Sequence, residues 1–215
     1  MKDYIAFPKL GLEFNISDTI AEFKLFGVQF SLKWYGLLIA IGFLLAVIYA
    51  MRRAKYFEID PDAMIDVVLV SALFAFIGAR LYYVVFSEDR SYYFSNPANI
   101  FKVWEGGLAI YGAVIGGIIA ALVFKQWRRV SVGDMMDIAA PSLILAQAIG
   151  RWGNYVNQEA HGGIILNPAL QWFPMGVQID GAWYQATFFY ESFWNVVVFI
   201  ILMAVRRKIK ARGGV

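Results

Sequence analysis

The stretch WYGLLIAIGFLLAVIYAM, residues 34–51, carries no charged side chain and is almost entirely apolar. A helix rises about 1.5 Å per residue, so crossing a hydrocarbon core about 30 Å thick takes about 20 apolar residues. Backbone polar groups in lipid must also find partners within the structure, which a helix provides locally. The stretch therefore predicts a membrane-spanning helix.

Four further apolar runs occupy residues 67–87, 106–124, 135–150 and 187–205. Their only charged residues are Arg80, Asp137 and Glu191. Strands of a membrane barrel would instead be about ten residues long and would alternate in polarity. The sequence predicts an all-α polytopic integral membrane protein in which residues 1–215 form one membrane domain with five transmembrane helices.

The composition excludes several other classes of protein. Hydrophobic residues make up 60% of the chain and charged residues 16%, whereas soluble domains carry about 25% charged residues. Cysteine is absent and histidine occurs once, at His161, so thiol nucleophiles and Cys/His zinc sites are excluded and no metal site is expected. The net charge of +3 is too small and scattered for a nucleic-acid partner.

Positive charge predicts the orientation of the helices. Lys and Arg gather after the first, third and fifth runs, within residues 52–55, 125–129 and 206–210. Cytoplasmic loops carry such an excess, which places the N-terminus outside and the C-terminus in the cytoplasm. The N-terminal arm 1–32 lacks an early apolar core, so no signal peptide is expected.

The segment 151–186 is predicted to form a small outward-facing cap on the membrane surface, since it holds few charges and is rich in Asn, Gln, Trp and Gly. Asp180-Gly181 is a hairpin-turn signal between two alternating runs within it. In the arm, Phe26, Val28, Phe30 and Leu32 alternate with other residues, which is typical of either a short strand or an interfacial segment.

Three ionisable residues, Arg80, Arg151 and Glu191, are expected in the outer half of the membrane. Such groups are costly in lipid and usually face a bundle interior or a water-filled cavity. One interpretation is a snorkelling arginine and two ordinary helix ends. The coincidence of depth favours a second interpretation, a polar pocket in which guanidinium groups bind a phospholipid phosphate.

The stretch GRWGNYVNQE, residues 150–159, adds polar groups beside Arg151. In a helix, Arg151, Asn154, Tyr155 and Gln158 would share one face, where amides can orient a polar ligand.

Two single residues leave alternatives open. Tyr111 is either a core tyrosine with a satisfied hydroxyl or a catalytic or ligand-orienting group. His161 is either a general base or part of a glycine-flanked surface turn, and the turn is favoured. Gly112 and Gly116 have the GxxxG spacing that lets helices pack closely.

The ten-residue stretch at 150–159 resembles the signature of bacterial prolipoprotein diacylglyceryl transferases. Four further matches occur in the family's order, over about residues 34–194. They resemble, in turn, the family's motif at the first helix, its arginine motif in the second helix, and the motifs that open its third and fifth helices. They are Trp34-Tyr35-Gly36, Gly78-Ala79-Arg80-Leu81 with Tyr83, Trp104-Glu105-Gly106-Gly107-Leu108, and Phe189-Tyr190-Glu191-Ser192.

The resemblance implies a reaction in the bacterial cell membrane, the first step of lipoprotein maturation. The diacylglyceryl group of phosphatidylglycerol moves to the lipobox cysteine thiol beside a prolipoprotein's signal peptide, and glycerol phosphate leaves. No cofactor is implied. Together with the charge pattern, the resemblance suggests Arg151, Tyr111 and Glu191 as catalytic residues. The suggested phosphatidylglycerol-binding residues are Arg151, Arg80, Tyr35, Asn154, Asn157 and Glu159.

The chain departs from the family's pattern in two respects. Tyr111 stands where the family usually has histidine, and the sequence stops at Val215, whereas the family usually continues to seven helices. Two other functions compete with the transferase. They are an anion or lipid transporter, which would need polar residues throughout the depth of several helices, and a non-catalytic lipid-binding protein.

Overall fold

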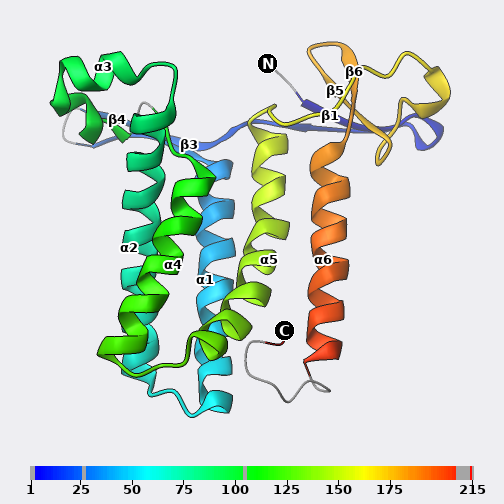
Figure 1. The fold of residues 1–215 in the computed structure, drawn as a ribbon. Helices are drawn as coiled ribbons and strands as arrows, with labels where there is room; N and C mark the ends of the chain where they lie inside the picture. Colours follow the sequence, from blue (N-terminus) through cyan, green and yellow to red (C-terminus); the bar gives the residue numbers. More distant parts are fainter. Residues whose placement is uncertain (1–2, 26–27, 104–105, 207–213, 215) are drawn as a thin grey trace. The chain divides into compact units, whose positions relative to one another are not determined.

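The computed structural model describes the chain except for residues 1–2, 26–27, 104–105, 207–213 and 215. Within the described ranges, five helices are long and apolar enough to cross a membrane (Figure 1). They are α1 (Trp34–Ala54), α2 (Pro61–Phe86), α4 (Ile110–Trp127), α5 (Val132–Val156) and α6 (Thr187–Val205). The predicted helical membrane fold is therefore confirmed.

The chain divides into two compact units. Of the described residues, the first unit holds those within 3–49 and 139–206, and the second holds those within 50–138 together with residue 214. Helices α1 and α5 each contribute to both units, whereas α2 and α4 belong to the second unit and α6 to the first.

The observed helix α2 is longer than the predicted run because it begins with a polar turn. Asp60 caps it by accepting a hydrogen bond from the Ala63 amide at 3.1 Å, and Pro61 occupies the first turn. Asp66, one turn further along α2, forms an ion pair with Arg128. The apolar run in the sequence begins only after these residues, at residue 67.

Boundaries of other helices also differ from the sequence expectation. Helix α4 begins at Ile110 rather than at residue 106, because Gly106 and Gly107 adopt φ values of +90° and +80°. Helix α5 runs from Val132 to Val156, past both predicted ends. The first residues assigned to the cap, 151–156, are therefore helical.

In the second unit, α2 and α4 cross at glycines. A Cβ atom on Gly112 would overlap the carbonyl oxygen of Gly78, and one on Gly116 would overlap that of Phe74. The backbones therefore approach as closely as the GxxxG spacing predicts. The second unit also contains a hydrophobic core cluster, in which Phe124 and Ile138 are fully buried.

Besides α6 and parts of α1 and α5, the first unit contains a four-stranded antiparallel sheet in the order β2–β1–β5–β6. The strands are β1 (Asp3–Phe7), β2 (Leu12–Ile16), β5 (Gly176–Ile179) and β6 (Ala182–Gln185). Asp180 and Gly181 join β5 to β6 with positive φ values of 48° and 83°, so the predicted hairpin turn is confirmed.

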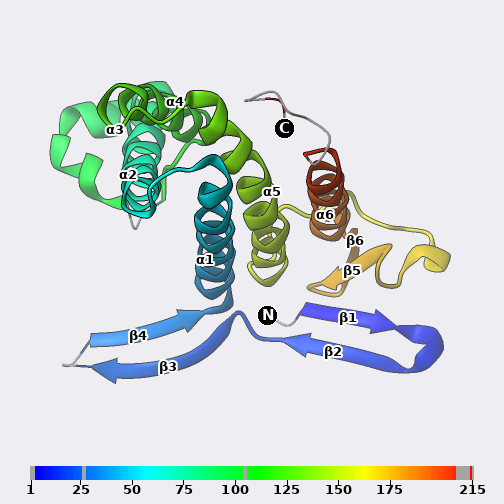
Figure 2. The same cartoon turned by 90° about the horizontal axis from the view of Figure 1, so that it is seen from below.

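The alternating segment of the N-terminal arm is a strand, β4 (Val28–Lys33), which pairs with β3 (Thr19–Leu25) and leads directly into α1 (Figure 2). Of the two interpretations left open, the strand is correct for Val28, Phe30 and Leu32, whereas Phe26 lies outside the described residues. Asp18 ties the junction, since its carboxylate lies 3.2 Å from the Lys33 ammonium and its carbonyl accepts from the Trp34 amide. Hydrogen bonds from Thr19 and Lys33 lower the pKa of Asp18.

The remaining described elements are short. Helix α3 (Arg90–Ser95) and the 3-10 turn η3 (Pro97–Phe101) follow α2. The other 3-10 turns are η1 (Pro8–Leu10), η2 (Lys55–Phe57) and η5 (Pro168–Leu170).

Candidate functional site

An ion pair joins the C-terminal part of α5 to the N-terminal part of α6. Arg151 Nη2 lies 2.6 Å from Glu191 Oε2, and both side chains are partly exposed, at 28% and 46%. Beside this pair, Trp152 Nε1 donates to the Ser192 hydroxyl at 3.1 Å. That hydroxyl donates in turn to the Ala148 carbonyl at 2.7 Å. Ser192 fixes the spacing of the two helices, a role that its sequence position did not reveal.

A chain of hydrogen bonds continues from Arg151 through the end of α5. Arg151 Nη1 donates to Asn154 Oδ1 at 3.4 Å, and Asn154 Nδ2 donates to Glu159 Oε1 at 3.0 Å. Asn157 Nδ2 lies 3.5 Å from the same carboxylate oxygen. Because Glu159 accepts from the amide nitrogen of Asn154, the amide oxygen of Asn154 is directed toward Arg151.

The backbone explains why Glu159 can reach back to Asn154. Gln158 adopts a left-handed conformation with φ 58°, which ends the helix. The Glu159 amide then donates to the Asn154 carbonyl at 2.9 Å. The Glu159 carboxylate thereby returns to the last turn of α5.

Tyr35, the second residue of α1, lies against the same part of α5. A Cβ atom on Gly153 would lie 2.6 Å from Tyr35 Cδ2, so only glycine lets the Tyr35 ring pack there. One unit thus holds a set of predicted site residues that we call the arginine cluster. It consists of Tyr35, Arg151, Asn154, Asn157, Glu159 and Glu191.

The guanidinium of Arg151 has donors to spare. It carries five N–H groups, and the structure pairs two of its three nitrogens, Nη1 and Nη2. Its Nε is buried and has no acceptor among the described residues. Buried donors without a partner are rare, and an anionic ligand oxygen is one acceptor that would satisfy this group.

Arg80 is placed differently, within the second unit. Its side chain is buried, with 5% exposure, and its guanidinium lies 5.0 Å from the Tyr93 ring centroid. All its nitrogens donate to backbone carbonyls at 2.7–3.3 Å. The acceptors are the carbonyls of Asn99, Ile100, Lys102, Gly106 and Gly107.

Five acceptors account for all five N–H groups of Arg80. The sequence expectation that Arg80 contacts the lipid phosphate is therefore not supported, since a phosphate would have to displace carbonyls that already occupy these donors.

Tyr111, the second residue of α4, is 69% exposed, so it is not a core tyrosine. Its ring centroid lies 6.1 Å from that of Tyr82, and its hydroxyl makes no hydrogen bond to another described residue. His161 lies in an exposed segment without regular secondary structure, with its ring 4.2 Å from the Tyr184 ring and Nδ1 3.3 Å from the Gly162 carbonyl oxygen. The structure therefore excludes a buried Tyr111 and places His161 at the surface, and the ligand role of Tyr111 stays a prediction.

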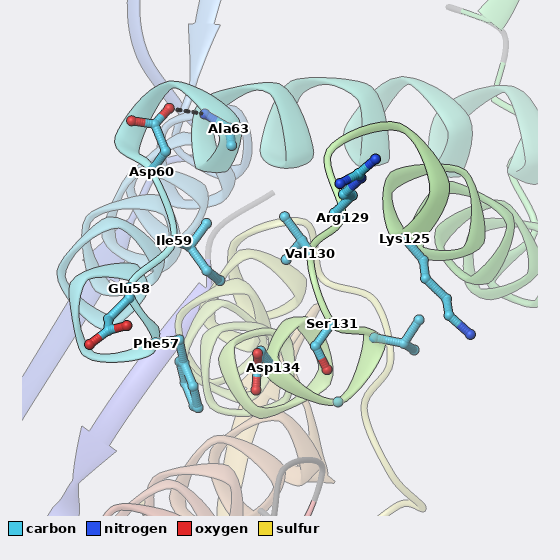
Figure 3. A pocket seen from close by; sticks show the side chains of 12 residues that line it. Phe57, Glu58, Ile59, Asp60, Ala63, Lys125, Arg129, Val130, Ser131 and Asp134 are labelled. Carbon is cyan, nitrogen blue, oxygen red and sulfur yellow. Dashed lines mark hydrogen bonds between the residues drawn. The ribbon is translucent and has the colours of Figure 1, made fainter.

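A separate cavity of about 610 Å³ lies in the second unit, where α2 and α5 begin and α4 ends (Figure 3). Its lining includes Lys125 and Arg129 but also Glu58, Asp60 and Asp134, so neither charge prevails. None of the predicted site residues lines it. In the part of the chain that the structure describes, no group of three or more His, Cys, Asp or Glu side chains is placed to hold a metal ion.

Residues 23–215 match the family model described as prolipoprotein diacylglyceryl transferase. The chain belongs to this family. The resemblance carried by the sequence motifs is thus confirmed, and the chain is a multi-pass membrane protein of a transferase family.

Three relatives illustrate the relationship to this family, and each is named phosphatidylglycerol–prolipoprotein diacylglyceryl transferase. The protein from Clostridium novyi is 46% identical over 197 residues, covering 90% of this chain and 75% of the relative. The Listeria monocytogenes protein is 43% identical over 189 residues, covering 85% and 68%. The Staphylococcus aureus protein is 42% identical over 207 residues, covering 94% and 72%.

Proposed function

We propose that this chain transfers the diacylglyceryl group of phosphatidylglycerol to the lipobox cysteine of prolipoproteins. The observation that carries the proposal is the 46% identity, over 90% of the chain, to a relative with that name. An arginine with an unpaired donor, held between a carboxylate and an amide, supports it independently. Family membership does not favour the transporter or the non-catalytic lipid-binding protein.

The proposed reaction exchanges one bond at a glycerol carbon. The cysteine sulfur attacks the carbon that carries the phosphate ester, a C–S bond forms, and the C–O bond to phosphate breaks. Glycerol phosphate leaves with the bonding electron pair, and the thiol proton passes to solvent or to the leaving phosphate. The chain's task is to hold the phosphate, to favour the thiolate and to keep the two in line.

Arg151 is the residue we assign to the phosphate. Its free Nε donor and the remaining Nη donors can bind phosphate oxygens while Glu191 holds the other side of the guanidinium. Asn154, oriented by Glu159, fixes the rotation of the guanidinium plane. Asn157 shares the Glu159 carboxylate, and the Tyr35 ring, also in the arginine cluster, packs against Gly153.

The thiol needs help to ionise, because its ordinary pKa is about 8.5. A guanidinium near the sulfur favours the thiolate, so a strong general base is not required. We assign Tyr111 the role of a hydrogen-bond donor to the phosphate or the sulfur, because its exposed hydroxyl makes no hydrogen bond to another described residue. The family's usual histidine could donate from the same position.

The test of this function is a transfer assay with the purified chain in phosphatidylglycerol vesicles and a lipobox peptide. We expect the peptide mass to increase by one diacylglyceryl group. A matched peptide with serine in place of the lipobox cysteine should not change. The chain itself has no cysteine, so thioether formation can be assigned to the peptide. No transfer by a folded chain, in an assay where a relative is active, would contradict the proposal.

We further propose that the chain lies in the bacterial cell membrane with its N-terminus outside. Ser91 in α3 and Gln126 near the end of α4 both have exposed side chains. Single cysteines at these positions should differ in labelling by an impermeant maleimide on intact protoplasts. We expect Ser91→Cys to react at once and Gln126→Cys only after lysis. The reverse order would invert the topology.

A further inference from the structure

The carbonyls that surround Arg80 belong to η3 and to the segment that connects η3 to α4. Asn99, Ile100 and Lys102 supply acceptors from one part of this stretch, and Gly106 and Gly107 supply them from the other. We call these five carbonyls the Arg80 socket. Carbonyls that converge on one point repel each other, so the segment depends on the cation for this shape.

Two tyrosine rings and a glycine also lie next to the Arg80 guanidinium. Tyr93 lies under the guanidinium at 5.0 Å, and the Tyr83 and Tyr93 ring centroids are 6.2 Å apart. A Cβ atom on Gly107 would lie 2.5 Å from Arg80 Nη1 and 2.8 Å from Tyr83 Cε1. The site therefore fits a planar group with five donors and leaves no room for a side chain at residue 107.

The same segment sets where α4 begins. Directly after Gly107, the Ala109 amide donates to the Ala79 carbonyl at 3.1 Å, which fixes the chain next to Arg80. Helix α4 starts at Ile110, and Tyr111 follows in its first turn. Three residues thus separate Gly107, which supplies the last socket carbonyl, from Tyr111.

From this geometry we propose that Arg80 is a positioning residue that acts on the transfer reaction through Tyr111. Its guanidinium shapes the socket, the socket sets the start of α4, and the start of α4 places the Tyr111 hydroxyl. This inference rests on the proposed function, and it replaces the expected phosphate contact. It differs from a merely structural role because it predicts a loss in kcat that depends on the presence of the Tyr111 hydroxyl.

Lysine should not replace Arg80, because an ammonium has three donors at a single point and cannot satisfy five carbonyls. In the vesicle assay we expect Tyr111→Phe and Arg80→Lys each to lower kcat about tenfold. The KM for phosphatidylglycerol should stay within about twofold, since Arg80 offers the phosphate no donor. In the Tyr111→Phe background, Arg80→Lys should cost less than about a further threefold.

Substitutions at two glycines provide a matched pair of variants in which Arg80 itself is not substituted. Gly106 and Gly107 both have positive φ, so alanine strains the backbone at either position. Only at Gly107 would the new Cβ meet the guanidinium, whereas at Gly106 nothing lies within 4 Å. We expect Gly107→Ala to reproduce the kcat loss of Arg80→Lys, and Gly106→Ala to retain more of the activity.

Chemical rescue and hydrogen exchange test the socket directly. Arg80→Ala should regain activity in millimolar guanidinium, which can fill the socket, whereas Tyr111→Phe should not. In the intact chain, Arg80→Lys should speed amide exchange of residues 99–103 and 106–109 relative to wild type. This exchange measurement does not depend on activity, so an inactive wild-type chain would refute the proposed function and still leave the socket tested.

Three outcomes would overturn the inference. One is an increase in KM with kcat unchanged on Arg80→Lys, which would make Arg80 a phosphate ligand. The second is a full additional loss of kcat in the Tyr111→Phe background, which would show that Arg80 does not act through Tyr111. The third is unchanged amide exchange in Arg80→Lys, which would show that the guanidinium does not shape the segment.

Discussion

Arg151→Ala is expected to lower kcat/KM for lipid transfer at least about tenfold and up to about a hundredfold, since one charge-assisted contact to phosphate contributes roughly 1.5–3 kcal/mol. The substitution also leaves the Glu191 carboxylate and the Asn154 amide oxygen without their partner. Arg151→Lys should recover little of the activity. An ammonium can pair with Glu191, but it lacks the planar fork that binds phosphate and carboxylate at once.

Two control variants separate a phosphate contact from a loss of structure. His161→Ala removes an exposed ring about ten residues further along the chain and should leave transfer within about twofold of wild type. Glu191→Gln keeps a hydrogen-bond acceptor for Arg151 but removes the charge, so it should reduce activity less than Arg151→Ala does. Full activity of both Arg151 variants in a folded chain would refute the assigned role.

The helices could be predicted from sequence because lipid imposes a length and an apolarity that few other structures share. The start of α6 at Thr187 and the end of the apolar run at Val205 agree with the observed helix. The start of α2 was missed because its first turn is polar and is defined by Asp60 and Pro61. Capping, and not hydropathy, determines that boundary.

The arginine cluster was accessible from sequence for a different reason. Side chains three residues apart in one helix are neighbours wherever that helix lies, so Arg151 and Asn154 could be paired in advance. The proximity of Arg151 to Glu191 was consistent with the expectation that both side chains lie at the same depth in the outer half of the membrane. Glu159 could be assigned a binding role from the family motif, but its hydrogen bond to Asn154 depends on the left-handed Gln158.

The role of Arg80 could not be found in this way. Its partners are backbone carbonyls, and every residue carries the same backbone carbonyl whatever its side chain is. Residue type therefore does not indicate where such acceptors will converge. The consecutive glycines Gly106 and Gly107 were the available signal, because glycine readily adopts the positive φ values that the structure shows at both positions.

The crossing of α2 and α4 leads to the prediction with the largest expected effect on stability. Gly112→Ala should prevent the two helices from packing, because the new Cβ would overlap the Gly78 carbonyl oxygen and lie 2.5 Å from Tyr82 Cβ. These are backbone and near-backbone atoms, which cannot rotate away. We expect the free energy of unfolding to fall by at least about 3 kcal/mol, the upper end of the usual overpacking cost.

Gly117→Ala, in the same helix, is the matched control because nothing lies within 4 Å of its Cβ position. Alanine restricts the unfolded chain more than glycine does, so this variant should gain about 0.5–1 kcal/mol. The same substitution five residues apart is thus expected to change stability in opposite directions. Thermal unfolding in detergent, followed by circular dichroism, measures both. Equal melting temperatures would show that α2 and α4 do not depend on the close approach at Gly112, because helix propensity alone would then account for both variants.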